Sequence, residues 1–207
     1  MSLTLRLYSD FVCPFCFVAE QSTVPRLLAE YDLVVDWRGF PLHPGTPKGG
    51  LPLEALFGAA RIPGVKAHMQ TFAARFGVTG IVHPERLPNS RRVLAMAEYA
   101  RVEGKLEEFR KAGMEAHWRH GNFLETDADL GAVAASVGLD AQAALAAADG
   151  ARCQGEVDRK LAEAAGAGVT GVPTFFIGDE VVVGCQPYEV LAAAADRAGA
   201  RRRARLF

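Results

Sequence analysis

The chain has 207 residues, half of them hydrophobic and 23% charged, a composition typical of a soluble globular protein with one large domain or one domain carrying an insertion. Its 23 basic and 24 acidic residues leave a formal net charge of −1, so no global field favours nucleic acid or an anionic membrane. The sequence has no apolar run long enough to span a bilayer and begins without a secretory-signal pattern, so we expect a cytoplasmic protein.

The first predicted elements are a strand, a helix and a second strand. Residues 3–9 alternate between apolar and polar side chains, residues 14–31 have the apolar spacing of one helix, and residues 33–40 form a largely apolar strand. Cys13 and Cys16, in the sequence CPFC, fall between the first strand and this helix. They therefore lie at the first turn of the helix.

A helical block is predicted after the second strand. Residues 41–52 contain four prolines and three glycines, too many for a regular element, and form the best candidate boundary. Beyond them, periodicity and capping signals predict helices over residues 89–104, 126–138, 139–150 and 155–168.

Strands return near the C-terminus. Residues 174–184 contain two short apolar runs around Gly178-Asp179, which predicts a β-hairpin. Residues 187–200 then have a helical pattern, with Pro187 suited to the first helical position. The predicted order is β-α-β, a helical block and β-β-α.

The two cysteines of CPFC have the spacing of a redox-active dithiol. Cys13 is expected at a helix N-terminus, where free N–H groups and the helix dipole stabilise a thiolate. Cys16, one turn further on the same side, is expected to be the more buried thiol and to lie within disulfide reach. Pro14 suits the first turn because its missing N–H needs no partner there. A zinc site would need two further ligands, and no second tight Cys or His pair supplies them, so no metal is expected.

Four segments of the chain together resemble one known family. They are residues 9–20 (SDFVCPFCFVAE), 88–100 (PNSRRVLAMAEYA), 168–178 (GVTGVPTFFIG) and 184–191 (GCQPYEVL). They are similar to the DsbA-like thioredoxin-fold oxidoreductases, in particular to the cytosolic FrnE-like branch. The resemblance implies an α/β thioredoxin-like fold with an inserted all-helical subdomain. It divides the chain into a thioredoxin-like core, residues 1–40 and 167–207, and a mainly helical insertion, residues 41–166.

The resemblance also assigns further site residues. It implies a cis Val172–Pro173 peptide bond that faces the cysteines and leaves the Val172 backbone open to an extended substrate. These two residues, together with Pro14 and Phe15, are the expected substrate contacts. Phe15 stands where the periplasmic oxidant of this family has histidine, so the very low thiol pKa of that oxidant is not carried over.

The sequence therefore predicts a thiol–disulfide oxidoreductase in which Cys13 attacks and Cys16 resolves. The expected partners are disulfide-bearing proteins or small thiols, held between core and insertion, and the direction of electron flow and the oligomeric state stay open. No cofactor is expected, with glutathione as an alternative cosubstrate. The rival is a kappa-type glutathione transferase or a 2-hydroxychromene-2-carboxylate isomerase-like enzyme, which resembles this chain in architecture but has serine in place of Cys13. A binding module without turnover is a third alternative.

Other cysteines and histidines are expected to be structural. Cys153 and Cys185 do not form a motif, and free cysteine is a common buried residue. His117 and His120 share a helical face beside Trp118, but no third metal ligand is in view, so core or solvent-facing roles are expected for them.

Overall fold

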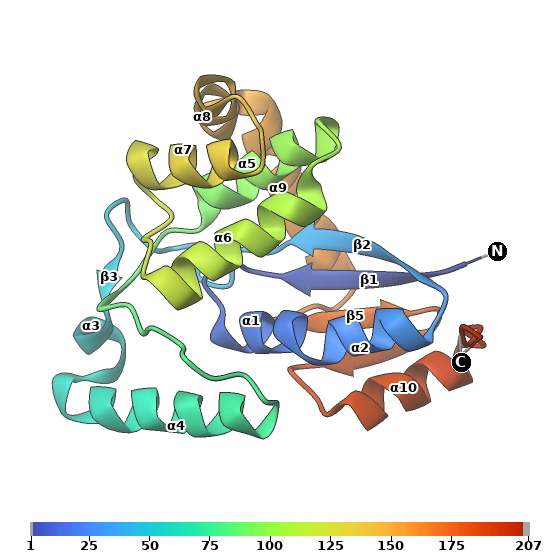
Figure 1. Ribbon diagram of the computed structural model, residues 1–207. Coiled ribbons are helices and arrows are strands. Elements are labelled where there is room, and N and C mark those ends of the chain that lie inside the picture. The colour runs from blue at the N-terminus through green and yellow to red at the C-terminus, as the bar shows by residue number, and fades with distance from the viewer. Residues whose placement is uncertain (1, 205–207) are drawn as a thin grey trace.

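A four-stranded sheet forms the centre of the molecule in the computed structural model, which describes residues 2–204 (Figure 1). Its strands are β1 (Leu3–Ser9), β2 (Leu33–Gly39), β5 (Thr174–Ile177) and β6 (Glu180–Val183). They follow the order β2-β1-β5-β6, with β1 and β2 parallel and the other neighbours antiparallel. The predicted C-terminal hairpin is therefore confirmed, and it lies in the same sheet as the two N-terminal strands.

Two helices connect β1 to β2 where the sequence predicts one. They are α1 (Pro14–Gln21) and α2 (Thr23–Glu30), separated at Ser22, whose backbone (φ −126°, ψ −78°) is not helical. The Ser22 hydroxyl donates to the Val18 carbonyl at 2.6 Å, a bond of the kind that competes with the helical backbone ladder. The apolar spacing continues across this break, so the pattern alone indicated a single helix.

The segment between β2 and β5 is mainly helical, as expected. Its elements are β3 (Leu51–Pro52), α3 (Leu53–Phe57), the 3-10 helix η1 (Ala59–Arg61), α4 (Ile62–Arg75), β4 (Arg86–Leu87), α5 (Arg91–Val102), α6 (Leu106–His120), α7 (Asp127–Ser136), α8 (Ala141–Asp149) and α9 (Ala151–Gly166). The ladder between β3 and β4 is an addition to the predicted all-helical subdomain. Each of these strands has two residues, too few for the alternation that reveals a strand in sequence.

The starts of α7 and α8 lie where the capping signals predict them. Thr126 and Asp140 each accept a backbone N–H with their side chains, at 3.1 and 2.7 Å, which satisfies free donors at the starts of α7 and α8. α9 begins at Ala151, earlier than predicted, and α10 (Tyr188–Arg197) begins directly after Pro187. No helix within residues 2–204 combines the length and the apolarity that a bilayer crossing requires.

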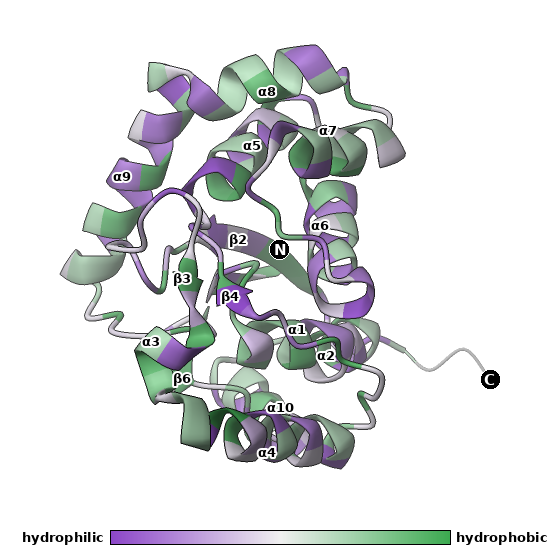
Figure 2. Ribbon diagram, turned by 90° about the vertical axis from the view of Figure 1, so that its left-hand side faces the viewer, coloured by the Kyte–Doolittle hydropathy of each residue, from purple (hydrophilic) through white to green (hydrophobic). Residues whose placement is uncertain are grey.

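The helices of the insertion lie in two groups (Figures 1 and 2). α5 to α9 gather beside the β2 edge of the sheet, whereas α3 and α4 lie apart from them. α10 packs on α2 and β6, at the other edge of the sheet. Because α1 contacts both α4 and α6, this helix lies between the two groups.

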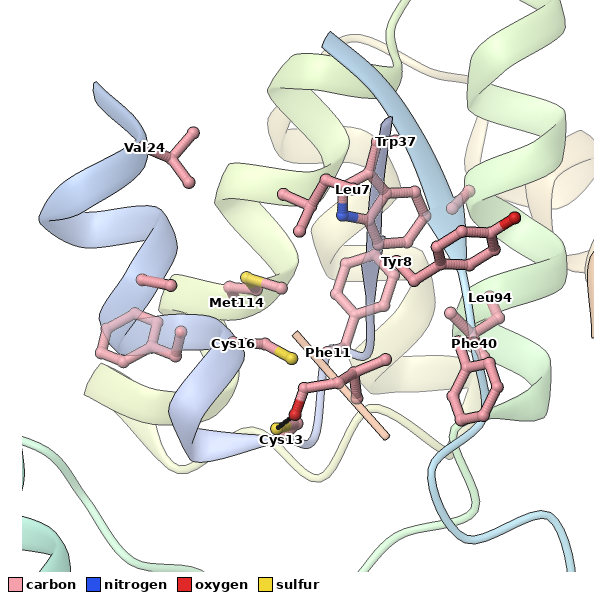
Figure 3. Packing of buried hydrophobic residues seen from close by; sticks show 14 of the residues in the cluster. Leu7, Tyr8, Phe11, Cys13, Cys16, Val24, Trp37, Phe40, Leu94 and Met114 are labelled. Carbon is pink, nitrogen blue, oxygen red and sulfur yellow. Dashed lines mark hydrogen bonds between the residues drawn. The ribbon is translucent and has the colours of Figure 1, made fainter. Parts of the chain in front are cut away.

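Large side chains fill the core behind α1 (Figure 3). The Phe11 ring packs edge-to-face on those of Trp37 and Phe109, with centroid distances of 5.5 and 5.9 Å, and all three are buried. An ion pair between Glu20 and Arg110 joins α1 to α6, and the exposed fractions of these side chains are 5% and 6%. The helix that carries CPFC is therefore held to the core by both apolar packing and a buried charge pair.

Candidate active site

The CPFC dithiol lies at the first turn of α1, as predicted. Cys13 is the N-cap residue with an extended backbone, Pro14 is the first helical residue, and Cys16 follows within the same turn. The Cys13 thiol donates to the Val172 carbonyl at 3.5 Å, the bond drawn dashed in Figure 3. Both cysteines are free. The geometry thus brings two thiols and one backbone carbonyl together.

Both thiols are buried, although the sequence led us to expect Cys16 to be more buried than Cys13. Each residue is 0% exposed. Val172, which lies 159 positions further along the chain, contacts Cys13 and contributes to its burial. A contact between residues so far apart in sequence cannot be recognised from a local sequence pattern. Burial, and then the hydrogen bond and charge of Cys13, raise the pKa of the Cys16 thiol well above its ordinary value.

The Val172–Pro173 peptide bond is cis, as the family resemblance implies. The Gly184 N–H donates to the Pro173 carbonyl at 2.7 Å and fastens this loop to the end of β6. The Val172 carbonyl already accepts the hydrogen bond of the Cys13 thiol, so a bound substrate strand would have to replace that bond.

Cys185, next to Gly184, is half-buried, and burial together with the charge of Cys13 raises the pKa of its thiol to about 12. A third thiol therefore lies close to the dithiol, which the sequence did not indicate.

Cys13 also lines a cavity of about 330 Å³ between the core and the insertion, called the apolar cavity below. Its lining residues are Val12, Cys13, Pro14, Phe15, Leu42, His43, Leu53, Leu56, Phe57, Val65, His68, Met69, His83, Pro84, Leu87, His117 and Trp118. These described lining residues include no Asp, Glu, Lys or Arg. The lining of the apolar cavity therefore offers no carboxylate, ammonium or guanidinium group, and Cys13 forms part of it.

A second hollow, of about 690 Å³, is called the polar groove below. It is lined by Ser22, Thr23, Arg26, Phe72, Arg75, Phe76, Cys185, Gln186, Pro187, Tyr188 and Glu189. Phe15 lines the apolar cavity and Phe72 lines the polar groove, and their rings meet edge-to-face at 5.0 Å. This ring pair therefore stands between the two hollows.

Two of the histidines that line the apolar cavity have an unpartnered ring nitrogen. The Nε2 atoms of His83 and His117 are buried and have no hydrogen-bond partner. His117 is 1% exposed, and its Nδ1 contacts the Asn122 carbonyl at 2.7 Å. Burial lowers the pKa of His117 from 6.5 to about 4, so its ring is neutral. His117 is therefore buried, which was one of the two roles expected from the sequence, whereas His120 is exposed to solvent.

A buried carboxyl group precedes the dithiol, and the sequence analysis did not single it out. Asp10 is 0% exposed, and its Oδ2 accepts the Leu42 N–H at 2.8 Å and the Ser90 hydroxyl at 3.1 Å. Burial raises the pKa of Asp10 from 3.8 to about 6, although these two bonds oppose the change. The only signal in the sequence was a lone acid in an apolar stretch directly after a strand. Through these two hydrogen bonds, Asp10 connects the loop before the dithiol to the insertion.

The remaining predicted sites can be placed as well. Cys153 is buried in α9, where burial raises the pKa of its thiol, and it is free. Within residues 2–204 no three His, Cys, Asp or Glu side chains gather into a group that could hold a metal ion.

A dithiol at the start of the first helix, a proline loop against it and a helical insertion in a four-stranded sheet define the class of thioredoxin-like thiol oxidoreductases. Residues 4–196 match the family described as the DSBA-like thioredoxin domain, and the chain belongs to this family. The thioredoxin-like fold with a helical insertion is thereby confirmed.

Similar proteins include both oxidoreductases and an isomerase. The YwbO protein of Bacillus subtilis is 29% identical over 199 residues, which cover 94% of this chain and 96% of that protein. A probable DsbA oxidoreductase from Streptomyces coelicolor has a similar structure, with 27% identity, a TM-score of 0.84 and coverage of 99% of this chain and 94% of that one. The 2-hydroxychromene-2-carboxylate isomerase of Sphingobium xenophagum is 27% identical over 190 residues, 89% of this chain and 93% of that protein.

Proposed function

We propose that the protein is a thiol–disulfide oxidoreductase in which Cys13 attacks the substrate and Cys16 resolves the intermediate. The observation that carries this proposal is the position of Cys13 at the N-cap of α1, with the Cys16 thiol one turn behind it. The free N–H groups and the dipole of the first turn stabilise negative charge on a sulfur atom at that position.

The reaction in the reducing direction has two steps. The Cys13 thiolate attacks one substrate sulfur, the substrate S–S bond breaks, and the other sulfur leaves as a thiolate that takes up a proton. Cys16 then attacks the Cys13 sulfur, which releases the second substrate thiol and leaves a Cys13–Cys16 disulfide. Forming the mixed disulfide removes the Cys13 hydrogen bond and charge that raise the pKa of Cys16, so the resolving thiol loses its proton more easily when it must act.

The test is the rate of disulfide exchange with an oxidised peptide. Cys13→Ser should abolish exchange because no other thiol occupies the N-cap. Cys153→Ala is the matched control, since this buried cysteine lies in α9, and it should keep the wild-type rate. Exchange at the wild-type rate in Cys13→Ser would overturn the proposal.

A 2-hydroxychromene-2-carboxylate isomerase-like or kappa-type glutathione transferase activity is the second candidate. The apolar cavity beside position 13 and the similarity to the isomerase favour it. Because those enzymes resemble this chain but carry serine at the place of Cys13, Cys13→Ser should then keep the activity. Turnover of 2-hydroxychromene-2-carboxylate with glutathione, compared between wild type and Cys13→Ser, separates the two candidates.

The substrate contacts are proposed from the same geometry. Pro14 and Phe15 line the apolar cavity, and the Val172 carbonyl meets the attacking thiol beside Pro173. Disulfide-bearing proteins and small thiols are the proposed partners.

Glutathione would meet charged side chains in the polar groove, where Arg26 and Arg75 offer partners for its carboxylates.

We also propose the division of the chain into a core of residues 1–40 and 167–207 and an insertion of residues 41–166. The FrnE-like branch and the cytoplasmic location stay predictions of the sequence.

A further inference from the structure

The lining of the apolar cavity limits what can bind there. Side chains from the first turn of α1, from α3 and from α4 supply mainly carbon atoms, and the described lining residues carry no acidic or strongly basic group. A ligand that enters loses water over most of its surface, so an unpaired carboxylate or ammonium group in the cavity would be costly. The cavity therefore selects for neutral, mainly apolar molecules.

Two lining histidines, His83 and His117, have an unpartnered Nε2, and the position of the ring proton can be assigned for His117. The Asn122 carbonyl can only accept, so the Nδ1 atom at 2.7 Å carries the proton and donates it. In the neutral ring, Nε2 then holds a free lone pair and can only accept. This atom is buried and unpartnered, and leaving it so carries a free-energy penalty that a ligand hydroxyl or N–H would remove.

We propose that the apolar cavity binds small, neutral, mainly apolar disulfides that carry a hydrogen-bond donor, and that His117 Nε2 accepts this donor and orients the ligand towards Cys13. The redox part of this inference rests on the proposed function, whereas the binding part does not. In the redox part the reduced dithiol supplies both electrons, each substrate sulfur leaves as a thiol, and the protein keeps the Cys13–Cys16 disulfide.

The binding part is tested on the reduced protein with probes that contain no sulfur. 2-Naphthol and naphthalene differ by one hydroxyl group, and equilibrium dialysis should show 2-naphthol bound about three- to tenfold more tightly than hydrophobic transfer alone explains. In His117→Phe this excess should vanish while naphthalene still binds, which a merely structural role of His117 would not produce. An excess that survives in His117→Phe, or tighter binding of 2-naphthoate than of 2-naphthol, would overturn the proposal.

A second variant tests the location of the site without touching His117. Val65→Trp places a large side chain in the cavity wall and should abolish binding of both probes. Val102→Trp, at an exposed position on α5, is the matched control and should leave binding unchanged. Equal binding in the two variants would overturn the assignment of the ligand to this cavity.

The redox part is tested with two disulfides of similar shape. Bis(2-hydroxyethyl) disulfide carries hydroxyl groups where dipropyl disulfide has methyl groups, so the ratio of their exchange rates should fall by about three- to tenfold in His117→Phe. An unchanged ratio, with exchange still present, would contradict the proposal for substrates. Cys13→Ser should lose exchange and keep probe binding, whereas retained exchange with intact probe binding would contradict the proposed function and leave the binding site standing.

Discussion

The two thiols of CPFC face different surroundings. Cys13 borders the apolar cavity, where His117 Nε2 has no partner. Cys16 is buried in the core, where the Ser9 hydroxyl donates to Glu20 at 2.7 Å and Glu20 is paired with Arg110. On the cavity side the His117 Nε2 has no partner, whereas on the core side the charges of Glu20 and Arg110 pair with each other, although the Arg110 Nε also lacks a hydrogen bond. Changes on the core side should therefore cost stability, and changes on the cavity side should mainly alter binding.

The largest effect is expected from breaking the buried charge pair. Glu20→Gln keeps an acceptor for Ser9 and Trp37 but leaves the Arg110 charge unpaired, which should cost about 3 to 5 kcal/mol in the free energy of unfolding. The double variant Glu20→Gln/Arg110→Met should recover part of this loss because no buried charge remains. Urea denaturation of both variants measures it, and a single variant as stable as wild type would show that the core side does not depend on this pair.

His117 should make the cavity side sensitive to acid. Its pKa is about 4 in the folded state and 6.5 ordinarily, so its contribution to stability is complete above pH 6.5 and is lost as the pH falls through 4. At about 1.4 kcal/mol per pKa unit, the wild type should lose about 3 kcal/mol relative to His117→Phe over this range. Parallel stability curves for the two proteins between pH 7 and pH 4 would contradict a neutral, buried imidazole.

Asp10 should give a pH dependence of opposite sign. Its folded pKa of about 6 lies above the ordinary 3.8, so its contribution to stability is complete below 3.8 and is lost as the pH rises through 6. Relative to Asp10→Asn, the wild type should lose up to about 3 kcal/mol over this range, at about 1.4 kcal/mol per pKa unit. Urea denaturation at several pH values checks the sign, and a wild type that gains stability against the variant as pH rises would refute it.

The smallest stability effect is expected at the wall between the two hollows. Phe15 is 37% exposed, so Phe15→Ala should cost only about 1 kcal/mol, mostly its ring contact with Phe72. It should also speed alkylation of Cys13, since the cavity wall opens. Phe17→Ala, a fully buried ring on the same helix, is the contrast and should cost about 3 to 5 kcal/mol. If Phe15→Ala and Phe17→Ala lowered the free energy of unfolding by the same amount, the proposed difference between the cavity side and the core side would be wrong.

The sequence predicted what depends on neighbouring residues. The strands of the central sheet, the hairpin and the place of CPFC at a helix start all follow from local patterns, and the starts of α7 and α8 follow from capping signals. The break at Ser22 escaped prediction because apolar spacing continues through it.

The apolar cavity could not be predicted because it joins side chains that are distant in sequence. The first turn of α1, α3, α4 and His117 on α6 meet only through tertiary packing. His117 was considered as a metal ligand on its local spacing with His120, and its neutral, accepting Nε2 became visible only with the Asn122 contact. The cis bond at Pro173 was expected from the family resemblance and not from any local pattern.

The division of labour between the two thiols is tested most directly by trapping the intermediate. Cys16→Ser, incubated with an oxidised peptide, should accumulate a mixed disulfide on Cys13 that mass spectrometry locates, because no thiol remains to resolve it. Cys13→Ser should carry no adduct, since its remaining CPFC thiol is buried and its pKa is raised. Adducts on Cys16 in Cys13→Ser, with none on Cys13 in Cys16→Ser, would contradict the assignment of Cys13 as the attacking thiol.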